Sequence, residues 1–186
     1  MLAGPMHLPK LTSKVLLVAF VLASIWLALV VLSPYMVPSG TLNDLSGRVG
    51  GHENDDQFKD LDALPGAVYW IGDAECHQIL NRSYALNGNQ MPYCARDLGL
   101  FVGIVLGFGF ASFCRWKMPP LFAVIGLVPI AIDGGLQAVT EYESNNPLRL
   151  ATGIVAGLVL SLLLAHFVFV AQEDRSRSPE NEPRSK

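Results

Sequence analysis

Four long stretches of the chain are apolar on every helical face. They span residues 15–37, 98–114, 120–140 and 150–171, and Asp133 is the one Asp, Glu, Lys or Arg residue within them. A helix in a soluble protein keeps a polar face, whereas about 20 apolar residues are needed to cross a hydrocarbon core of ~30 Å. The pattern therefore predicts an all-α, polytopic membrane protein built as a four-helix bundle.

The composition agrees with a membrane protein, since 51% of residues are hydrophobic and only 16% are charged. The uncharged apolar run at the start of the first stretch, residues 15–32, is longer than the ~7–15 apolar residues of a secretory signal, and Pro34 and Pro38 follow this run instead of a small-residue cleavage site. We therefore expect a retained anchor. The net charge of −3, with no basic stripe, argues against a nucleic-acid partner.

Basic residues gather at alternate ends of the four stretches. They are Lys10 and Lys14, then Arg115 and Lys117, then Arg175 and Arg177. Because Lys and Arg of short connections collect on the cytoplasmic side, residues 1–14, 115–119 and 172–186 are predicted to be cytoplasmic. Residues 38–97 and 141–149 then face outward. The chain is thus predicted to be a multi-pass protein of the cytoplasmic membrane, with both termini inside and a long extracytoplasmic first loop.

Four short motifs lie in or beside the outward connections. They are C-H-Q-x-x-x-R-S from Cys76, C-A-R-x-x-G-x-x-x-G from Cys94, D-G-x-x-Q from Asp133 and S-N-N-x-L-R-x-x-T-G from Ser144. In this order they resemble a prokaryotic membrane-protein family described as domain of unknown function 2085, over roughly residues 76–157. The resemblance implies a multi-helix membrane fold and no particular activity.

The chain departs from many of those relatives at one position. Relatives look like C-A-R-C, whereas this chain reads Cys94, Ala95, Arg96, Asp97. The CxxC pair is therefore absent. A metal site at this point would need Asp97 as a ligand in place of a thiolate.

Asp133 is the most informative candidate residue. It lies within the third apolar stretch, and a position eight residues before Glu141 is ~12 Å below the outer end of a continuous helix. A carboxylate at such a depth is costly and marks a functional candidate. Asp97, at the outer end of the second stretch, could join it, and two carboxyl groups that share a proton can activate water. This pair predicts an intramembrane aspartic peptidase that needs no cofactor and cleaves a membrane-inserted precursor.

The plan of four helices with two outer aspartates is similar to lipoprotein signal peptidase, also called signal peptidase II. That architectural resemblance implies processing of lipoprotein signal peptides, although the Asn-rich motifs of that family have no counterpart here. In this interpretation Arg82, Arg96 or Arg149 contacts lipid phosphate or shapes the site. Gln137 and Asn146 would orient substrate or catalytic groups through amide hydrogen bonds.

Both aspartates also have purely structural interpretations. Asp133 could pair with Arg96 or Arg149 and lock the bundle, and Asp97 could be the N-cap of the second helix. The chain would then be a noncatalytic assembly or lipid-binding subunit. The sequence leaves the oligomeric state open.

Cys76 and Cys94 give a third class of hypothesis. In an oxidising outer compartment the two cysteines could form a disulfide. Alternatively, Cys76, His77, Cys94 and Asp97 could bind zinc, since thiolate, imidazole and carboxylate are its usual ligands. The chain would then be an extracytoplasmic metal-dependent or thiol-dependent membrane factor.

Glycine spacing indicates how the helices pack. Gly99, Gly103 and Gly107 repeat every fourth residue, as do Gly153 and Gly157. Such spacing lets helix backbones approach closely in lipid. We expect these glycines to pack within the bundle.

Overall fold

The computed structural model describes residues 11–177 of the chain. The predicted cytoplasmic segment before residue 11, which includes Lys10, and the tail after residue 177 lie outside the described residues.

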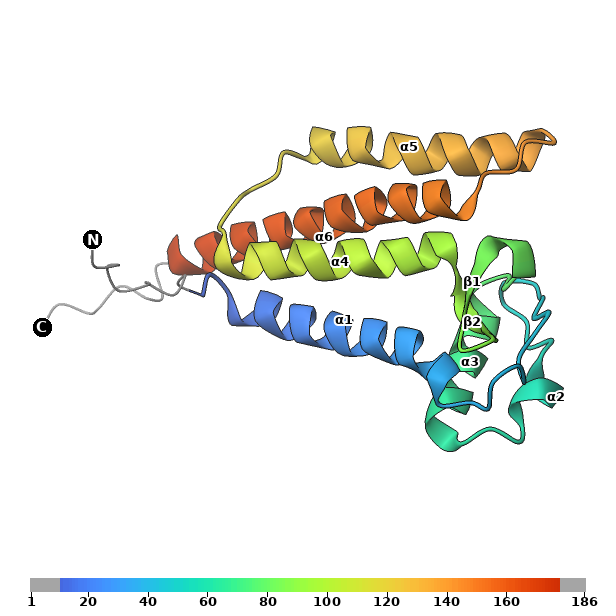
Figure 1. The fold of residues 1–186 in the computed structure, drawn as a ribbon. Coiled ribbons are helices and arrows are strands. Elements are labelled where there is room, and N and C mark those ends of the chain that lie inside the picture. Colours follow the sequence, from blue (N-terminus) through green and yellow to red (C-terminus); the bar gives the residue numbers. More distant parts are fainter. Residues whose placement is uncertain (1–10, 178–186) are drawn as a thin grey trace, which may run out of the picture.

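Within residues 11–177, four helices are long and apolar enough to cross a membrane: α1 (Lys14–Leu32), α4 (Ala95–Phe113), α5 (Pro120–Val139) and α6 (Asn146–Arg177). They lie side by side in the order α1, α4, α6, α5 (Figure 1). Large apolar side chains of α1 and α5 stay exposed, among them Leu22 and Leu121, as lipid-facing helices require. The predicted fold class, a polytopic helical membrane protein, is confirmed.

Two helices extend beyond the apolar stretches that predicted them. α4 begins at Ala95, three residues before the stretch, and α6 runs from Asn146 to Arg177 instead of from residue 150 to 171. Backbone hydrogen bonding continues past the point where hydrophobicity ends, so polar residues occupy the terminal turns. The first turn of α4 thereby includes Arg96 and Asp97, which places both at the mouth of the bundle.

The described ends of the chain lie at the same end of the bundle. The Thr12 hydroxyl donates to the carbonyl of Ala111 at 2.6 Å, and the Gln172 amide donates to the Ser13 hydroxyl at 2.8 Å. The segment between α1 and α4 covers the opposite end (Figure 1). We call that segment, residues 33–94, the cap.

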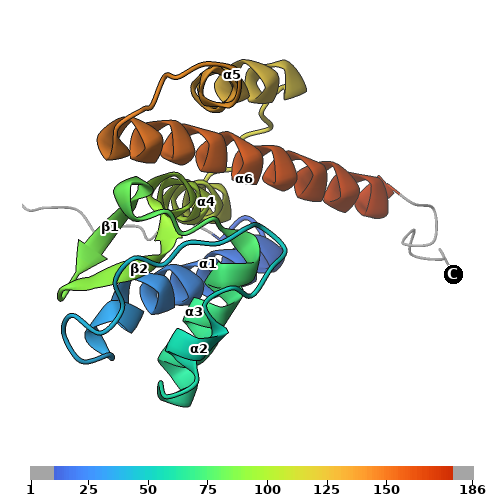
Figure 2. The ribbon, with the colours of Figure 1, turned by 90° about the vertical axis from the view of Figure 1, so that its right-hand side faces the viewer.

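The cap is folded, although the Gly-, Asn- and Asp-rich sequence at its start is typical of a surface loop. Its elements are η1 (Ser33–Tyr35), α2 (Asp55–Phe58), α3 (Ala63–Glu75), η2 (Leu80–Arg82), β1 (Ser83–Leu86) and β2 (Asn89–Cys94). Figure 2 shows them gathered over the ends of α1 and α4. β1 and β2 form an antiparallel hairpin whose turn residues Asn87 and Gly88 both have positive φ, the conformation of a type I′ turn.

A small core of its own holds the cap together. Tyr69, Leu42 and Leu45 are fully buried in it, and the Tyr69 hydroxyl donates to the Gln90 carbonyl at 2.7 Å. The Gln90 side chain in turn donates to the carbonyl of Gln78. Burial with satisfied polar groups makes the segment rigid, so the cap can position functional side chains.

α4 and α6 are in direct backbone contact along the predicted glycines. A Cβ atom on Gly103 would collide with the carbonyl oxygen of Ile154, and one on Gly153 would collide with that of Arg96. The prediction that these glycines pack within the bundle is confirmed. These two helices form the centre of the bundle, where α1 packs against α4 and α5 packs against α6.

Candidate functional site

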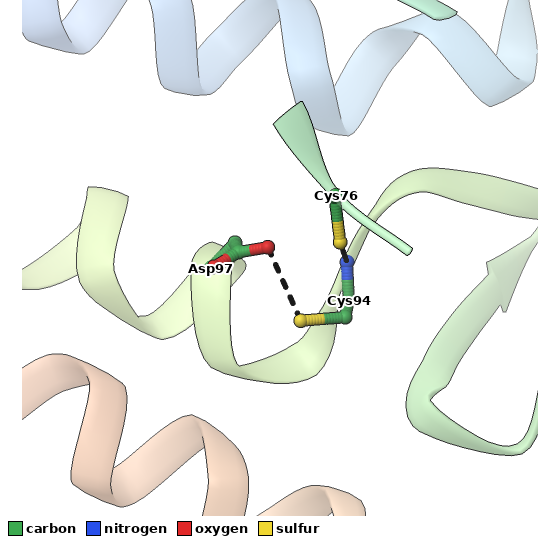
Figure 3. Close-up of side chains that lie close together, drawn as sticks. All are labelled: Cys76, Cys94 and Asp97. Carbon is green, nitrogen blue, oxygen red and sulfur yellow. Dashed lines mark hydrogen bonds between the residues drawn. The ribbon is translucent and has the colours of Figure 1, made fainter. Parts of the chain in front are cut away.

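Three potential metal ligands meet where the cap joins α4. Cys76 follows the last residue of α3, Cys94 ends β2, and Asp97 lies in the first turn of α4. One side-chain donor atom from each lies within 4.8 Å of the other two. The Cys94 backbone N–H donates to Cys76 Sγ at 3.3 Å, and Cys94 Sγ lies 3.2 Å from Asp97 Oδ2 (Figure 3). We call these three residues the donor cluster.

The cap brings Cys76 to this point through two local features. Gly72 lets α3 lie directly against β2, because a Cβ atom there would collide with the Pro92 carbonyl oxygen. After α3 the chain turns sharply at Gln78, which has a φ of 45°, and the Gln78 side chain donates to that same Pro92 carbonyl at 2.8 Å. Cys76 is therefore buried against Cys94 instead of facing solvent.

The two thiols have opposite pKa shifts. The Cys76 thiol donates to Cys94 and lowers the pKa of Cys94, whose place at the N-terminus of α4 also favours a thiolate. The pKa of Cys76 is raised, because it keeps the shared proton and because it is buried near Asp97. The first thiolate to form is therefore on Cys94.

An ionised Cys94 creates an unbalanced charge in the donor cluster. The Cys94–Asp97 contact of 3.2 Å is a hydrogen bond only while the Cys94 thiol keeps its proton. Once Cys94 ionises, two negative atoms face each other at this distance, which is unfavourable in a half-buried place. A bound cation would remove that repulsion.

A cavity of about 350 Å³ opens beside the donor cluster. In addition to Cys76, Cys94 and Asp97, its polar lining comprises Glu75, His77, Arg82, Arg96, Gln137 and Arg149. His77 is exposed and belongs to the wall of the cavity, outside the three-residue cluster. The structure thus gathers the predicted candidates around one space, with the exception of Asp133 and Asn146.

Asp133 lies on the other side of Arg96 and forms an ion pair with it. The Asp133 side chain is only 4% exposed, and the Ser144 hydroxyl donates to its Oδ2 at 3.3 Å. Gln137 joins this network, since it accepts from Arg96 at 3.2 Å and donates to Ser144 at 2.8 Å. We call these four residues the ion-pair network. It matches the alternative in which Asp133 pairs with Arg96.

The two aspartates therefore have different partners. Among the described residues, Asp97 and Asp133 share no hydrogen bond, because Asp97 contacts Cys94 while Asp133 contacts Arg96 and Ser144. The structural interpretation of Asp97 as an N-cap is wrong. Cys94 holds the N-cap position, and Asp97 lies three residues further on, inside the first turn.

The remaining candidates connect α6 to the cap. Arg149 Nη1 donates to Asn146 Oδ1 at 3.1 Å, and the Asn146 amide donates to the Ser83 carbonyl at 3.2 Å. Arg82 Nε donates to Glu143 Oε1 at 3.2 Å. Sequence reasoning missed Glu143 as a partner.

Ser144 was also missed as a member of the site. Its one signal in the sequence was that it begins the S-N-N motif. That motif does not predict a hydrogen bond to Asp133, which lies 11 residues earlier in the chain. Only the folded connection between α5 and α6 brings the hydroxyl to the carboxylate.

Cys76 and Cys94 are free thiols in the structure. Their proximity is compatible with either a disulfide or a shared metal ion, so the disulfide stays a prediction. Cys114, at the far end of α4, is an exposed free thiol.

The family of predicted membrane proteins DUF2085 matches residues 76–163. An uncharacterized protein of Methanocaldococcus jannaschii is 32% identical over 107 residues, which cover 55% of this chain and 69% of that protein. The chain belongs to the DUF2085 family. An uncharacterized protein of Methanothermobacter thermautotrophicus is 33% identical over 99 residues, or 50% of this chain and 89% of that protein. No solved structure matches the chain.

The DUF2085 segment contains most of the site, whereas Val49 and Glu75 of the cavity lining lie before it. It begins at Cys76 and ends within α6, so it includes the donor cluster and the ion-pair network. α1 and most of the cap lie before it. Most chemistry-bearing residues of this DUF2085 protein are thus separate in sequence from α1 and from the first part of the cap, which ends with α3.

Proposed function

We propose that this protein binds a divalent transition metal, with zinc as the best fit, through Cys76, Cys94 and Asp97, and that the metal acts on a substrate in the adjoining cavity. The observation that carries the proposal is the convergence of two sulfur atoms and one carboxylate oxygen within 4.8 Å. Ligand atoms around a tetrahedral zinc lie roughly 3–4 Å apart. The donor cluster supplies the required atom types, and the distance between Cys94 Sγ and Asp97 Oδ2, 3.2 Å, lies in that range.

Three protein ligands are typical of a catalytic zinc site, because the fourth position then stays open for water or substrate. The open side of the donor cluster is the cavity. When bound, zinc supplies a Lewis acid suited to hydrolysis. His77, on the cavity wall, can carry a proton or complete the ligand set.

The metal content of the purified full chain tests this proposal. We expect about one zinc per chain in mild detergent, measured by mass spectrometry of the metal. Cys94→Ser should lose the metal, and Cys114→Ser is the matched control that should keep it. A wild-type chain that holds no zinc, and takes up none on reconstitution, would contradict the proposal.

One observation favours a second function, the intramembrane aspartic peptidase. Within the described residues, the buried Oδ1 of Asp133 has no hydrogen-bond partner, so this carboxylate keeps an acceptor free for a substrate or water. Asp97 would have to approach it for the two to share a proton. The test is precursor processing in whole membranes, where Asp97→Asn and Asp133→Asn should both accumulate uncleaved signal segments, including those of lipoproteins.

We also propose that the cap faces outward from the cytoplasmic membrane, with the described ends of α1 and α6 inside. Basic residues support this orientation, because Arg115 and Lys117 both pair with Glu173 at the end opposite the cap. In intact cells, a membrane-impermeant maleimide should label Ser39→Cys in the exposed start of the cap. It should leave Cys114 unlabelled until the cells are broken.

A further inference from the structure

Arg149 is a buried guanidinium with unused hydrogen-bond donors. Its side chain is 3% exposed and lines the cavity. Of its nitrogens, Nη1 donates to Asn146, while among the described residues Nε and Nη2 have no hydrogen-bond partner. Glu143 Oε1 lies 3.7 Å from Nη2, too far for a hydrogen bond. Because an unsatisfied buried charged donor is costly, its persistence here points to a ligand.

Two more guanidinium groups, those of Arg82 and Arg96, line the same cavity. The Nε atom of Arg96 is also buried without a partner among the described residues. Free donors therefore come from two helices, α4 and α6.

The carboxylates near the cavity already accept hydrogen bonds from protein groups, and the exception is Oδ1 of Asp133, which has no partner among the described residues. Glu75 accepts from the Tyr93 hydroxyl at 2.7 Å, Glu143 accepts from Arg82, and Asp133 accepts from Arg96. Asp97 belongs to the donor cluster. The unmet hydrogen-bonding capacity on the arginines is thus of donor type, and it suits an anion.

We propose that this cavity binds the phosphate group of a phosphate ester, with Arg149 as its principal donor. A tetrahedral oxyanion accepts hydrogen bonds in several directions and can serve guanidinium groups on two helices, whereas a carboxylate accepts within one plane. The volume of about 350 Å³ holds a phosphate together with a small organic group.

The inference rests on the proposed function in one respect, since it names the substrate class of the metal site. Phosphate beside the donor cluster would place the ester within reach of the bound metal. The binding of phosphate itself does not need the metal.

The ester could be a lipid headgroup or a soluble compound. A second hollow of about 370 Å³, with apolar walls that include Val128, Ile132, Leu136 and Leu148, lies between α5 and α6. The same turns of α5 contribute Gly134 and Gln137 to the arginine-lined cavity. A lipid could therefore place its acyl chain in this hollow and its phosphate in the cavity, on two sides of α5.

The experiment measures binding of inorganic phosphate to the full chain in uncharged detergent by calorimetry, against chloride at equal ionic strength. Phosphate should bind, and Arg149→Gln should weaken it by about tenfold or more. Arg48→Gln is the matched control, because Arg48 is an exposed residue of the cap outside the cavity lining, and it should bind as the wild type does. Arg149→Lys keeps the positive charge but loses the planar set of guanidinium N–H donors, so its affinity for phosphate should lie between those of the wild type and Arg149→Gln.

A second arm separates the two sources of the ester. Phosphatidylcholine nanodiscs with and without phosphatidic acid are compared for their effect on the thermal unfolding of the wild type. Stabilisation by phosphatidic acid without binding of inorganic phosphate assigns a lipid headgroup, and binding of inorganic phosphate assigns a site open to soluble esters. If neither probe acts on the wild type, the inference is overturned.

The failure of this inference is distinguishable from the failure of the metal site. Cys94→Ser should lose zinc and still bind phosphate. If the wild-type chain binds zinc but neither phosphate probe, the proposed metal centre stands and the proposed phosphate site is wrong.

Discussion

Arg96 and Asp97 are neighbours in the first turn of α4, yet they serve two regions with different chemistry. Arg96 belongs to the ion-pair network, in which Asp133, Ser144 and Gln137 supply partners from α5 and from the connection to α6. Asp97 belongs to the donor cluster, where the neighbouring groups are thiols. The protein thus balances the charge of one region itself, and leaves negative donors unbalanced in the other.

The difference in partners indicates that one region stabilises the fold and that the other is the candidate site for chemistry. A buried carboxylate with a cationic partner stabilises the arrangement of helices, and losing either partner leaves a costly charge. Converging donors beside an open cavity gain most from a ligand that the chain lacks. We therefore assign a stabilising side-chain link between α4 and α5 to the ion-pair network and propose the donor cluster as the place of the candidate chemistry.

Asp133→Asn should cause the largest loss of stability. It leaves the Arg96 guanidinium without its counter-charge, and breaking a buried pair from one side costs about 3–5 kcal/mol. The free energy of unfolding, measured by denaturant titration in micelles, should fall while zinc content stays unchanged. In the double variant Arg96→Gln with Asp133→Asn, the loss should be smaller than the sum of the two single losses. A stable Asp133→Asn chain that fails to process precursors would instead favour the peptidase.

Asp97→Asn should have the opposite effect, with weaker zinc binding and little change in stability. Removing a carboxylate ligand should weaken zinc binding by roughly 10–100-fold or more, with little change in thermal stability. Asp97→Cys supplies a thiolate at the same place and should restore binding. Competition with a zinc-chelating dye measures both affinities, which should fall with decreasing pH because protons compete for the ligands. Equal zinc affinity in wild type and Asp97→Asn would remove Asp97 from the metal centre.

Gly153→Ala should disturb both regions at once. The added methyl group would press on the carbonyl of Arg96, and overpacking of this kind costs about 1–3 kcal/mol. Both the unfolding free energy and the zinc affinity should drop. Gly135→Ala is the matched control, because a Cβ atom there meets nothing within 4 Å, and it should be no less stable than the wild type. Similar behaviour of the two alanine variants would argue against the close α4–α6 contact.

Thiol reactivity should show the smallest effect, a rate difference of about severalfold at neutral pH. In a Cys114→Ser background, Cys94 should react with iodoacetamide before Cys76 does. The reason is that Cys94 has the lowered pKa and therefore holds thiolate at a lower pH, whereas the buried Cys76 has a raised one. Mass spectrometry of timed samples measures both rates, and zinc should protect both thiols. Faster modification of Cys76 would show that the thiolate forms first on Cys76 and that its assignment to Cys94 is wrong.

The membrane class, the four long helices and most of the candidate residues could be predicted from the amino-acid sequence. Hydrophobicity is a local property, so stretches such as 120–140 could be read without knowing their neighbours. Asp133 was conspicuous for the same reason, since a carboxylate in an apolar stretch needs a partner or a function. The four-residue glycine spacing likewise predicted the close packing that α4 and α6 display.

Which of these candidate residues lie together depends on contacts between segments that are far apart in the chain. The cap folds around long-range contacts, such as the Tyr69 hydroxyl with the Gln90 carbonyl, and no local pattern encodes them. Its fold sets Cys76 against Cys94, although 18 residues separate them in the chain. One turn of helix sends adjacent side chains in different directions, so Arg96 contacts Asp133 while Asp97 joins the thiols. Short motifs, and a charge within an apolar stretch, identify such residues in the sequence. Their partners depend on how the cap and α5 are placed around the first turn of α4.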